Sequence, residues 1–425
     1  MNNLNRRVFI NRSMAAMAGA VLAPAWAGAT AGANELFSPS GVPGGDENWW
    51  RMVKSQFSLE EGLIYFNNGS LGPSPEIVID KTEKFRRILD GFPSRYMWGA
   101  WDNEKEEVRK RISGYFGTGS GNIAIIHNTT EGMNLFSRSF GLKPGDEIIL
   151  ADHEHVTGTT PYQYYCESRG VKLVRPVLPL MPSDPGEITE VYRKSITPRT
   201  RLISMVHMTN TNGMILPVRE ISELARRKGI FVVVDGAQTA GMFRINLDEL
   251  GCDCYAASGH KWLFGPKGTG ILYARNEVIE KLEPLMLAHQ FETKSIRTFE
   301  DYNTRNLPEV LGLGAAVDFN NLIGQEVKEK RIYELKHYFR QQLESDRSFT
   351  IKTPADDRLS AGIQVVEVRG RDVSTASSYL FDNYGIDCRP MTSHGLNALR
   401  ISLSVFTTLE DVDLLVKALR RFSAT

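Results

Sequence analysis

Cysteine is scarce in this chain of 425 residues. The four cysteines, Cys166, Cys252, Cys254 and Cys388, are too few and too scattered for a disulfide scaffold, even in an oxidising compartment. Cys252 and Cys254 form a C-x-C pair, but no second pair completes a metal site. We therefore predict no metal centre and expect the cysteines to be small buried apolar residues.

Net charge is also absent, because 50 lysines and arginines balance 50 aspartates and glutamates. Without a basic surplus, there is no electrostatic basis for binding nucleic acid or an anionic membrane surface. The expected partner is a small molecule. A chain of this length can hold two domains and bury a sizeable core.

No long uninterrupted apolar run opens the chain. The alanine-rich segment from Met14 to Ala29 is short and broken by glycine and proline, which disfavours a membrane anchor. It follows the twin-arginine pattern Asn5 to Ile10 and offers small-x-small cleavage sites. Residues 1–33 are therefore predicted to be a twin-arginine export signal, followed by an N-terminal segment at 34–62. The mature protein is expected to be periplasmic or secreted, without membrane contact.

The stretch from Val232 to Leu272 carries the strongest chemical signal. Asp235 ends the apolar run Phe231–Val234, which is typical of a strand buried on both faces of a parallel sheet. Its carboxylate is expected at the carboxyl end of that strand, where α/β folds bind ligands. Lys261 follows a second short strand, Cys254–Ala257, and precedes a Gly-Pro turn. A desolvated lysine that forms a Schiff base, and a carboxylate that keeps a pyridine ring protonated, are what pyridoxal 5'-phosphate requires.

The same stretch resembles the cofactor-lysine signature of the class V aminotransferase family, whose members are fold-type I pyridoxal-phosphate enzymes. The pattern VDGAQ…D…SGHK-W-GPKGTG matches that signature nearly position for position. The resemblance implies that Lys261 binds the cofactor, that Asp235 pairs with the pyridinium and that Gln238 bonds the phenolic oxygen. Ser258 and His260 flank the turn and are expected to contact the phosphate or the ring.

Two earlier segments complete the predicted cofactor site. The predicted strand Ile123–Ile126 leads into TTEGMN, where Thr129 or Thr130 can cap a helix and the free backbone amides can hold a phosphate. The family has such a run at its phosphate site, so the resemblance assigns both threonines to the cofactor phosphate. An aromatic ring is also needed to sandwich the pyridine. The resemblance assigns this stacking role to His155, with His153 as the nearest alternative.

The middle of the chain alternates strands and helices. After the strand Leu202–Val206, the resemblance assigns Asn210 to the cofactor's phenolic oxygen, with Asn212 as the alternative. This alternation is typical of a mostly parallel sheet. We predict an α/β three-layer sandwich over residues 63–307, the fold type I of pyridoxal-phosphate-dependent transferases, with Thr269–Tyr273 as its edge strand.

Residues 308–425 are predicted to form a linking helix, from about Glu309 to Gln341, and a small C-terminal α/β domain. Within it, Leu399–Ser404 resembles the family's carboxylate-binding strand. The resemblance implies that Arg400 forms a bidentate clamp on the substrate's α-carboxylate, with Arg389 near a parallel position.

Two further segments bear on substrate and assembly. The strand and turn from Leu63 to Pro73 resemble an entry segment across the active-site mouth, which makes Asn68 and Ser70 candidate substrate contacts. Thr304 is similar to a family position that reaches the phosphate of the neighbouring subunit, so a homodimer with shared active sites is expected. Asn303 replaces the usual glycine there, and asparagine tolerates the same left-handed backbone.

Fold and cofactor do not fix the reaction. Transamination, racemisation or epimerisation, elimination and sulfur abstraction remain open, with Lys261 carrying the proton. The overall pattern looks most like the isopenicillin N epimerase-like branch. We therefore predict an epimerase or aminotransferase acting at the α-carbon of a small amino acid, and a C–S or β-lyase as the alternative. Desulfuration is disfavoured because the loop Pro390–Asn397 lacks cysteine. A non-catalytic periplasmic binding protein is disfavoured because both Lys261 and Asp235 are present.

Overall fold

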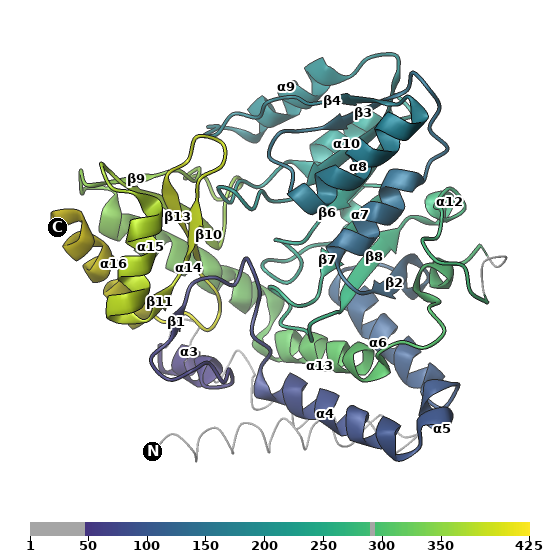
Figure 1. Cartoon of the computed structure of the whole chain (residues 1–425), viewed down its shortest axis with the longest axis horizontal. Coiled ribbons are helices and arrows are strands. Elements are labelled where there is room, and N and C mark those ends of the chain that lie inside the picture. Colours follow the sequence, from purple (N-terminus) through teal and green to yellow (C-terminus); the bar gives the residue numbers. More distant parts are fainter. Residues whose placement is uncertain (1–46, 290–293) are drawn as a thin grey trace.

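The computed structural model describes residues 47–289 and 294–425 (Figure 1). The export signal predicted at residues 1–33 lies outside these ranges, as does the first part of the predicted N-terminal segment. Both stay predictions. Within the described ranges, no helix is both long enough and apolar enough to cross a membrane.

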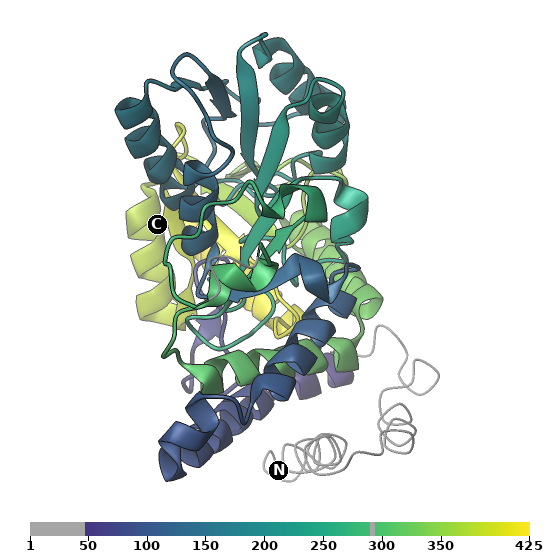
Figure 2. The same cartoon turned by 90° about the vertical axis from the view of Figure 1, so that its right-hand side faces the viewer.

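A seven-stranded sheet forms the centre of the larger part of the molecule (Figures 1 and 2). Its spatial order is β2-β8-β7-β6-β5-β3-β4, and within this sheet only β8 runs antiparallel to its neighbours. The prediction of a mostly parallel sheet is confirmed. The strands are β2 (Ile123–Ile126), β3 (Glu147–Leu150), β4 (Lys172–Val174), β5 (Thr200–Val206), β6 (Phe231–Asp235), β7 (Cys254–Ser258) and β8 (Gly270–Ala274).

The prediction that residues 269–273 form the edge strand is wrong. β8 lies between β2 and β7, and all five of its residues are buried. Because β8 is antiparallel to β7, a direct connection without a crossover helix returns the chain beside β7. The far side of β8 then pairs with β2, which takes the edge position instead.

Side chains of each strand alternate between two hydrophobic cores on opposite faces of the sheet. On β6, Val232 and Val234 belong to one core and Val233 to the other. Burial on both faces explains the continuous apolar runs in the sequence, and the three-layer α/β sandwich is confirmed. The first core is covered by α6 (Asp102–Tyr115), α9 (Pro185–Ser195), α10 (Val218–Arg226) and α13 (Leu307–Ile323), and the second by α7 (Thr129–Arg138) and α8 (Val156–Arg169).

The linking helix predicted from about Glu309 to Gln341 is in fact two helices. α13 ends at Gly324, where φ is 87° and ψ is 129°, and α14 (Gln325–Leu343) begins immediately after it. Glycine adopts a positive φ without the steric cost that a Cβ brings, so the helix ends at this residue. Before this break, α13 packs against α4 (Glu76–Gly91) (Figure 2).

The C-terminal part packs a four-stranded antiparallel sheet against three helices (Figure 1). Leu335, Leu399 and Leu415 belong to its separate hydrophobic core. The sheet order is β12-β13-β10-β9, with β9 (Phe349–Ile351), β10 (Ile363–Val368), β12 (Arg389–Met391) and β13 (Ala398–Ser402), and the helices are α14, α15 (Val373–Tyr384) and α16 (Leu409–Ala424). The remaining short helices are α3 (Glu47–Lys54), α5 (Pro93–Met97), α11 (Leu247–Leu250), α12 (Asn276–Ile279) and two 3-10 turns, Ser120–Asn122 and Ile296–Glu300.

The entry segment joins the two parts. β1 (Ile64–Tyr65) pairs in parallel with β11 (Ile386–Asp387) of the C-terminal part, although the predicted boundary at residue 63 places β1 in the large domain. A few residues later, the N–H of Gly72 donates to the carbonyl oxygen of His260 at 2.8 Å. The turn after β1 therefore contacts both parts of the molecule.

Candidate active site

One cavity opens at the carboxyl ends of β5, β6 and β7, between the sheet and the starts of α7 and α8. All but one of the residues predicted to hold the cofactor line this cavity, and the exception is Thr304. The lining consists of Asn128, Thr129, Thr130, His155, Thr157, Val206, Met208, Asn210, Asp235, Ala237, Gln238, Ser258, His260 and Lys261.

Lys261 enters the cavity from the loop after β7. The pKa of its ammonium group is lowered to about 8, chiefly by burial, while the charge of Asp235 raises it and those of Arg400 and Arg389 lower it. A lowered pKa leaves a sizeable fraction of the amine unprotonated near neutral pH. That fraction is the nucleophile which can add to an aldehyde.

Asp235, the last residue of β6, faces the same cavity. Its Oδ1 accepts a hydrogen bond from the N–H of Ala237 at 2.9 Å. Burial raises the pKa of the carboxyl group, while the charges of Lys261 and His155 lower it. A buried carboxylate is unfavourable unless a cation pairs with it, and a protonated ring nitrogen is such a cation.

α7 begins at the other end of the cavity. Its N-cap is Asn128, whose side chain accepts from the N–H of Glu131 at 3.0 Å. The alternative that Thr129 or Thr130 caps this helix is therefore wrong, since both are already helical. The N–H and hydroxyl of Thr129 contact the Ser258 hydroxyl at 3.1 and 2.9 Å. Hydroxyls at the positive end of a helix form a set suited to a phosphate.

His155, and not His153, lies in the cavity. It is the N-cap of α8, its Nδ1 is 2.7 Å from Oγ1 of Thr157, and burial lowers the pKa of its ring. His153 instead contacts the hydroxyl of Thr211 at 2.7 Å and stacks on His394, with ring centroids 4.1 Å apart. Of the two candidates, only His155 can cover a bound ring.

Asn210, and not Asn212, lines the cavity, because the side chain of Asn212 is fully buried and bonded to other parts of the chain. Gln238 also lines it. Its amide nitrogen donates to the carbonyl oxygen of Gly69 at 2.8 Å, and its oxygen accepts from the indole N–H of Trp262 at 3.1 Å. These two bonds orient Gln238 at the cavity wall.

Arg400 and Arg389 lie beside each other next to the cavity. They are directly paired residues of β13 and β12. Arg400 is 1% exposed, and its guanidinium donates to the Asn210 carbonyl at 3.1 Å, the Ser70 hydroxyl at 2.6 Å and Oδ1 of Asn67 at 3.3 Å. Arg389 is exposed and donates to the same Ser70 hydroxyl at 3.2 Å. The predicted substrate arginines do not line the cavity themselves, and Asn210 connects Arg400 with it.

Asn68 is completely buried, and neither polar atom of its side-chain amide has a hydrogen-bond partner within the described chain. An unsatisfied buried amide costs roughly 1–3 kcal/mol. Its Oδ1 would lie 3.0 Å from a Cβ at Gly72, so it packs inside the entry turn. Contact between Asn68 and substrate stays a prediction.

Thr304 is exposed and does not reach the cavity of its own chain. The residue before it, Asn303, has a φ of 61°, so the predicted left-handed backbone is confirmed. The shared-site homodimer stays a prediction.

Three polar residues at or beside the cavity escaped the sequence analysis: Asn67, Asn128 and Thr157. The apolar lining residues Val206, Met208 and Ala237 escaped it as well. An asparagine just before a run of helix-forming residues is a cap signal, which makes Asn128 recognisable in principle. Thr157 follows His155, the predicted stacking residue, by two positions and contacts its ring nitrogen. Asn67 has no comparable local signal.

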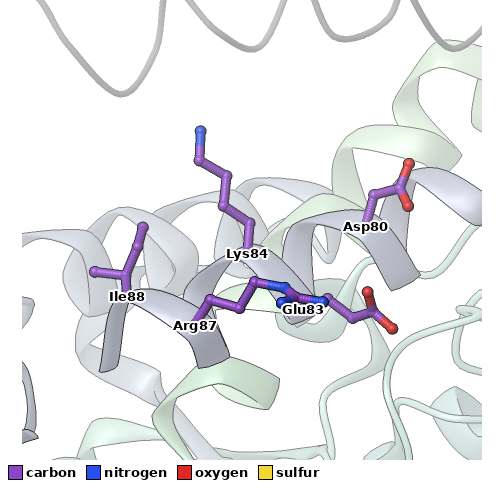
Figure 3. A pocket seen from close by; sticks show the side chains of 5 residues that line it. All are labelled: Asp80, Glu83, Lys84, Arg87 and Ile88. Carbon is purple, nitrogen blue, oxygen red and sulfur yellow. The ribbon is translucent and has the colours of Figure 1, made fainter. Parts of the chain in front are cut away.

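A second hollow lies on the outer face of α4 (Figure 3). It is lined by Asp80, Glu83, Lys84, Arg87 and Ile88, all from one helix. This spacing is typical of the solvated face of an amphipathic helix, and among the described residues no group from another element lines the hollow. It is not a candidate active site.

Comparison with known proteins identifies the family. The family model described as Aminotransferase class-V matches residues 64–415. The chain belongs to this family. It is 30% identical over 387 residues to isopenicillin N epimerase of Streptomyces clavuligerus, covering 87% of this chain and 97% of that protein. It is also 30% identical over 403 residues to cysteine desulfurase of Serratia proteamaculans (strain 568), covering 87% and 97%. The crystal structure of the cysteine desulfurase CsdA from Escherichia coli superposes with a TM-score of 0.75, at 25% identity, covering 88% of this chain and 98% of the other.

Pyridoxal 5'-phosphate is the cofactor of this class V enzyme, and the cavity fits it. Asp235 faces this space from the end of β6 and Lys261 from the loop after the neighbouring β7, and the N-terminus of α7 faces it from the other side. Nδ1 of His260 is buried at the cavity without a hydrogen-bond partner in the described residues. The cavity therefore offers a nucleophile, an anion for the ring nitrogen and donors for a phosphate.

Proposed function

We propose that this enzyme acts at the α-carbon of a small amino acid as an epimerase or an aminotransferase. The convergence of Lys261 and Asp235 in one cavity, with Arg400 connected to it through Asn210, carries the proposal. These groups supply a base, an anionic ring partner and a carboxylate ligand. The binding-protein alternative requires neither a lysine with a lowered pKa nor a buried aspartate.

Pyridoxal phosphate, when bound, withdraws electrons from the α-carbon of an attached amino acid. The chain's own residues then determine the outcome. Arg400 holds the α-carboxylate with two parallel N–H groups. The amine of Lys261 takes and returns the α-proton as general base and acid. Asp235 keeps the ring nitrogen protonated, His155 covers the ring face, and Thr129 with Thr130 binds the phosphate.

The loop before Arg400 favours these two reactions over sulfur transfer. Residues 390–397 contain no cysteine, and Cys388 is 3% exposed. Burial raises the pKa of the Cys388 thiol to about 12, which disfavours the thiolate that sulfur abstraction needs. A C–S lyase that releases its product without a protein thiol is the second candidate, supported by similarity to cysteine desulfurases.

Two experiments test the proposal. The purified wild type should absorb visible light through its lysine-bound cofactor, and Lys261→Ala should not. The coloured enzyme is then incubated with single amino acids in heavy water. Deuterium at the α-carbon with loss of chirality supports epimerisation, a keto acid formed only with an acceptor supports transamination, and pyruvate with ammonia supports elimination. A wild type that stays colourless after reconstitution would contradict the proposal.

Export and assembly belong to the same proposal. The twin-arginine route carries folded proteins, which suits an enzyme that takes up its cofactor in the cytoplasm before reaching the periplasm or the medium. A homodimer would bring Thr304 to the phosphate of the neighbouring subunit. Chemical cross-linking and cell fractionation test these two points separately.

A further inference from the structure

We propose that the active site binds a substrate with a second anionic group, as in a dicarboxylic amino acid, and that Arg389 recognises this group. The inference rests on the proposed function, because it takes Arg400 as the ligand of the α-carboxylate. It adds a subsite beside the cavity and names a class of substrate.

Arg389 and Arg400 face the same side of their sheet. They are direct partners across the antiparallel pair β12–β13, where opposite Cβ atoms are about 4.5–5.5 Å apart. Both guanidinium groups donate to one acceptor, the Ser70 hydroxyl, at 3.2 and 2.6 Å. Two like charges so arranged repel each other unless an anion lies between or beside them.

Neither guanidinium forms an ion pair with a carboxylate in residues 47–289 and 294–425, in contrast to two other deeply buried arginines. Arg109 and Arg331 are as deeply buried as Arg400, at 1% exposed, and each pairs with glutamates. Arg389 and Arg400 instead donate only to neutral acceptors in the described residues. The site therefore carries two positive charges that its own chain does not balance.

Asp387 of β11, the acidic side chain bonded to the entry turn, does not fill this need. It accepts a hydrogen bond from Nδ2 of Asn67 at 3.3 Å. Burial raises the pKa of Tyr65, and the charge of Asp387 raises it further. Asp235 lies in the cavity, opposite Lys261, where the ring nitrogen of the cofactor would occupy it. One α-carboxylate neutralises one arginine and leaves the second charge unmatched.

The different exposure of the two arginines assigns the roles. Arg400 is buried and fixed by three hydrogen bonds, as a ligand for the group next to the reacting carbon must be. Arg389 is exposed and makes one bond, so it can follow side chains of different length. The distal carboxylate of an aspartate-like or glutamate-like substrate fits that position.

Isothermal titration calorimetry of the holoenzyme tests the subsite without turnover. The probes are succinate and glutarate, each compared with its monoamide, succinamate or glutaramate, because none of the four has an amino group that reacts with the cofactor. At low ionic strength we expect each diacid to bind about tenfold more tightly than its monoamide, and salt to reduce the difference. Arg389→Gln should abolish the preference and leave monoamide affinity within about twofold. Arg389→Lys should retain part of it.

Two results would overturn the inference. The diacids and monoamides bind equally to the wild type, or Arg389→Gln weakens both by the same factor, which means that both guanidinium groups hold a single carboxylate. The proposed function is tested separately, by comparing the visible absorption of the wild type with that of Lys261→Ala. The calorimetric preference depends on neither colour nor turnover.

Discussion

The N–H of Gly72 donates a 2.8 Å hydrogen bond to the carbonyl oxygen of His260, so the entry turn is fastened to the residue before the reactive lysine. A Cβ at Gly72 would lie 2.1 Å from the carbonyl oxygen of Lys261, far inside any real contact. We expect Gly72→Ala to push the turn away, lower stability by about 1–3 kcal/mol and weaken cofactor binding. Thermal unfolding and cofactor titration measure the two effects.

Gly114→Ala is the matched control. A Cβ at Gly114, inside α6, meets nothing within 4 Å, so this variant should keep cofactor affinity and gain roughly 0.5–1 kcal/mol from helix propensity. Equal cofactor affinity in both alanine variants would mean that the turn does not hold the lysine loop.

Reconstitution with cofactor should depend on pH through Lys261. Its pKa is lowered from 10.5 to about 8, and only the neutral amine attacks the aldehyde. The rate constant for recovery of visible absorption should therefore rise about tenfold per pH unit below pH 8 and level off above it. Arg389 lowers this pKa, so Arg389→Gln should shift the midpoint upward. A wild-type rate that keeps rising beyond pH 10 would contradict the assignment.

Asp235→Asn should remove the anionic partner of the ring while keeping its shape. We expect kcat to fall by about 100-fold or more, with cofactor still bound and the fold intact. Steady-state kinetics and circular dichroism measure these outcomes.

Asp253→Asn is the control for this variant, because it should change stability and not kcat. Asp253 is equally buried, but it accepts from the N–H of Val232, pairs with Arg275 and does not line the cavity. Its variant should lose about 1–3 kcal/mol of stability and keep kcat. Similar loss of kcat in both variants would indicate general destabilisation of the site.

The native protein should resist thiol reagents. All four cysteines are buried, and burial raises the pKa of Cys166 to about 11, of Cys252 and Cys388 to about 12, and that of Cys254 well above its usual value. Thiolates are the reactive species, so labelling should be slow until the protein is denatured. After incubation with cysteine, mass spectrometry should find no persulfide on the protein. A persulfide on Cys388 would contradict this prediction and would support sulfur abstraction as the reaction.

The cofactor-binding part of the site was predictable because parallel strands end at the same edge of a sheet. Asp235 directly ends an apolar strand, and Thr129 and Lys261 follow shortly after such strands. The carboxyl ends of parallel strands meet at one edge of the sheet. Position along the chain therefore translates into position in space. Asn303 was predictable from residue type alone, since asparagine tolerates a positive φ.

Other features depend on long-range packing that no local pattern encodes. Asn67 and Arg400 are 333 residues apart in the chain, and Asn67 follows β1, which pairs with β11 of the C-terminal part. β8 lies inside the sheet because β2 pairs with its far side. Both strands are short and apolar, so their sequences do not indicate that they pair or in which register. The break at Gly324 looks, in sequence, like one tolerated glycine within a long helical pattern.

The position of β8 has a consequence for the order in which the enzyme can be assembled. β2 pairs with no strand of the seven-stranded sheet other than β8, yet β8 leaves the ribosome long after β2. During synthesis, β2 cannot pair within the sheet until β8 has been translated. The position of α7, which follows β2, is fixed no earlier. The segment predicted to bind the phosphate is thus completed only after the lysine loop at residue 261 has been translated.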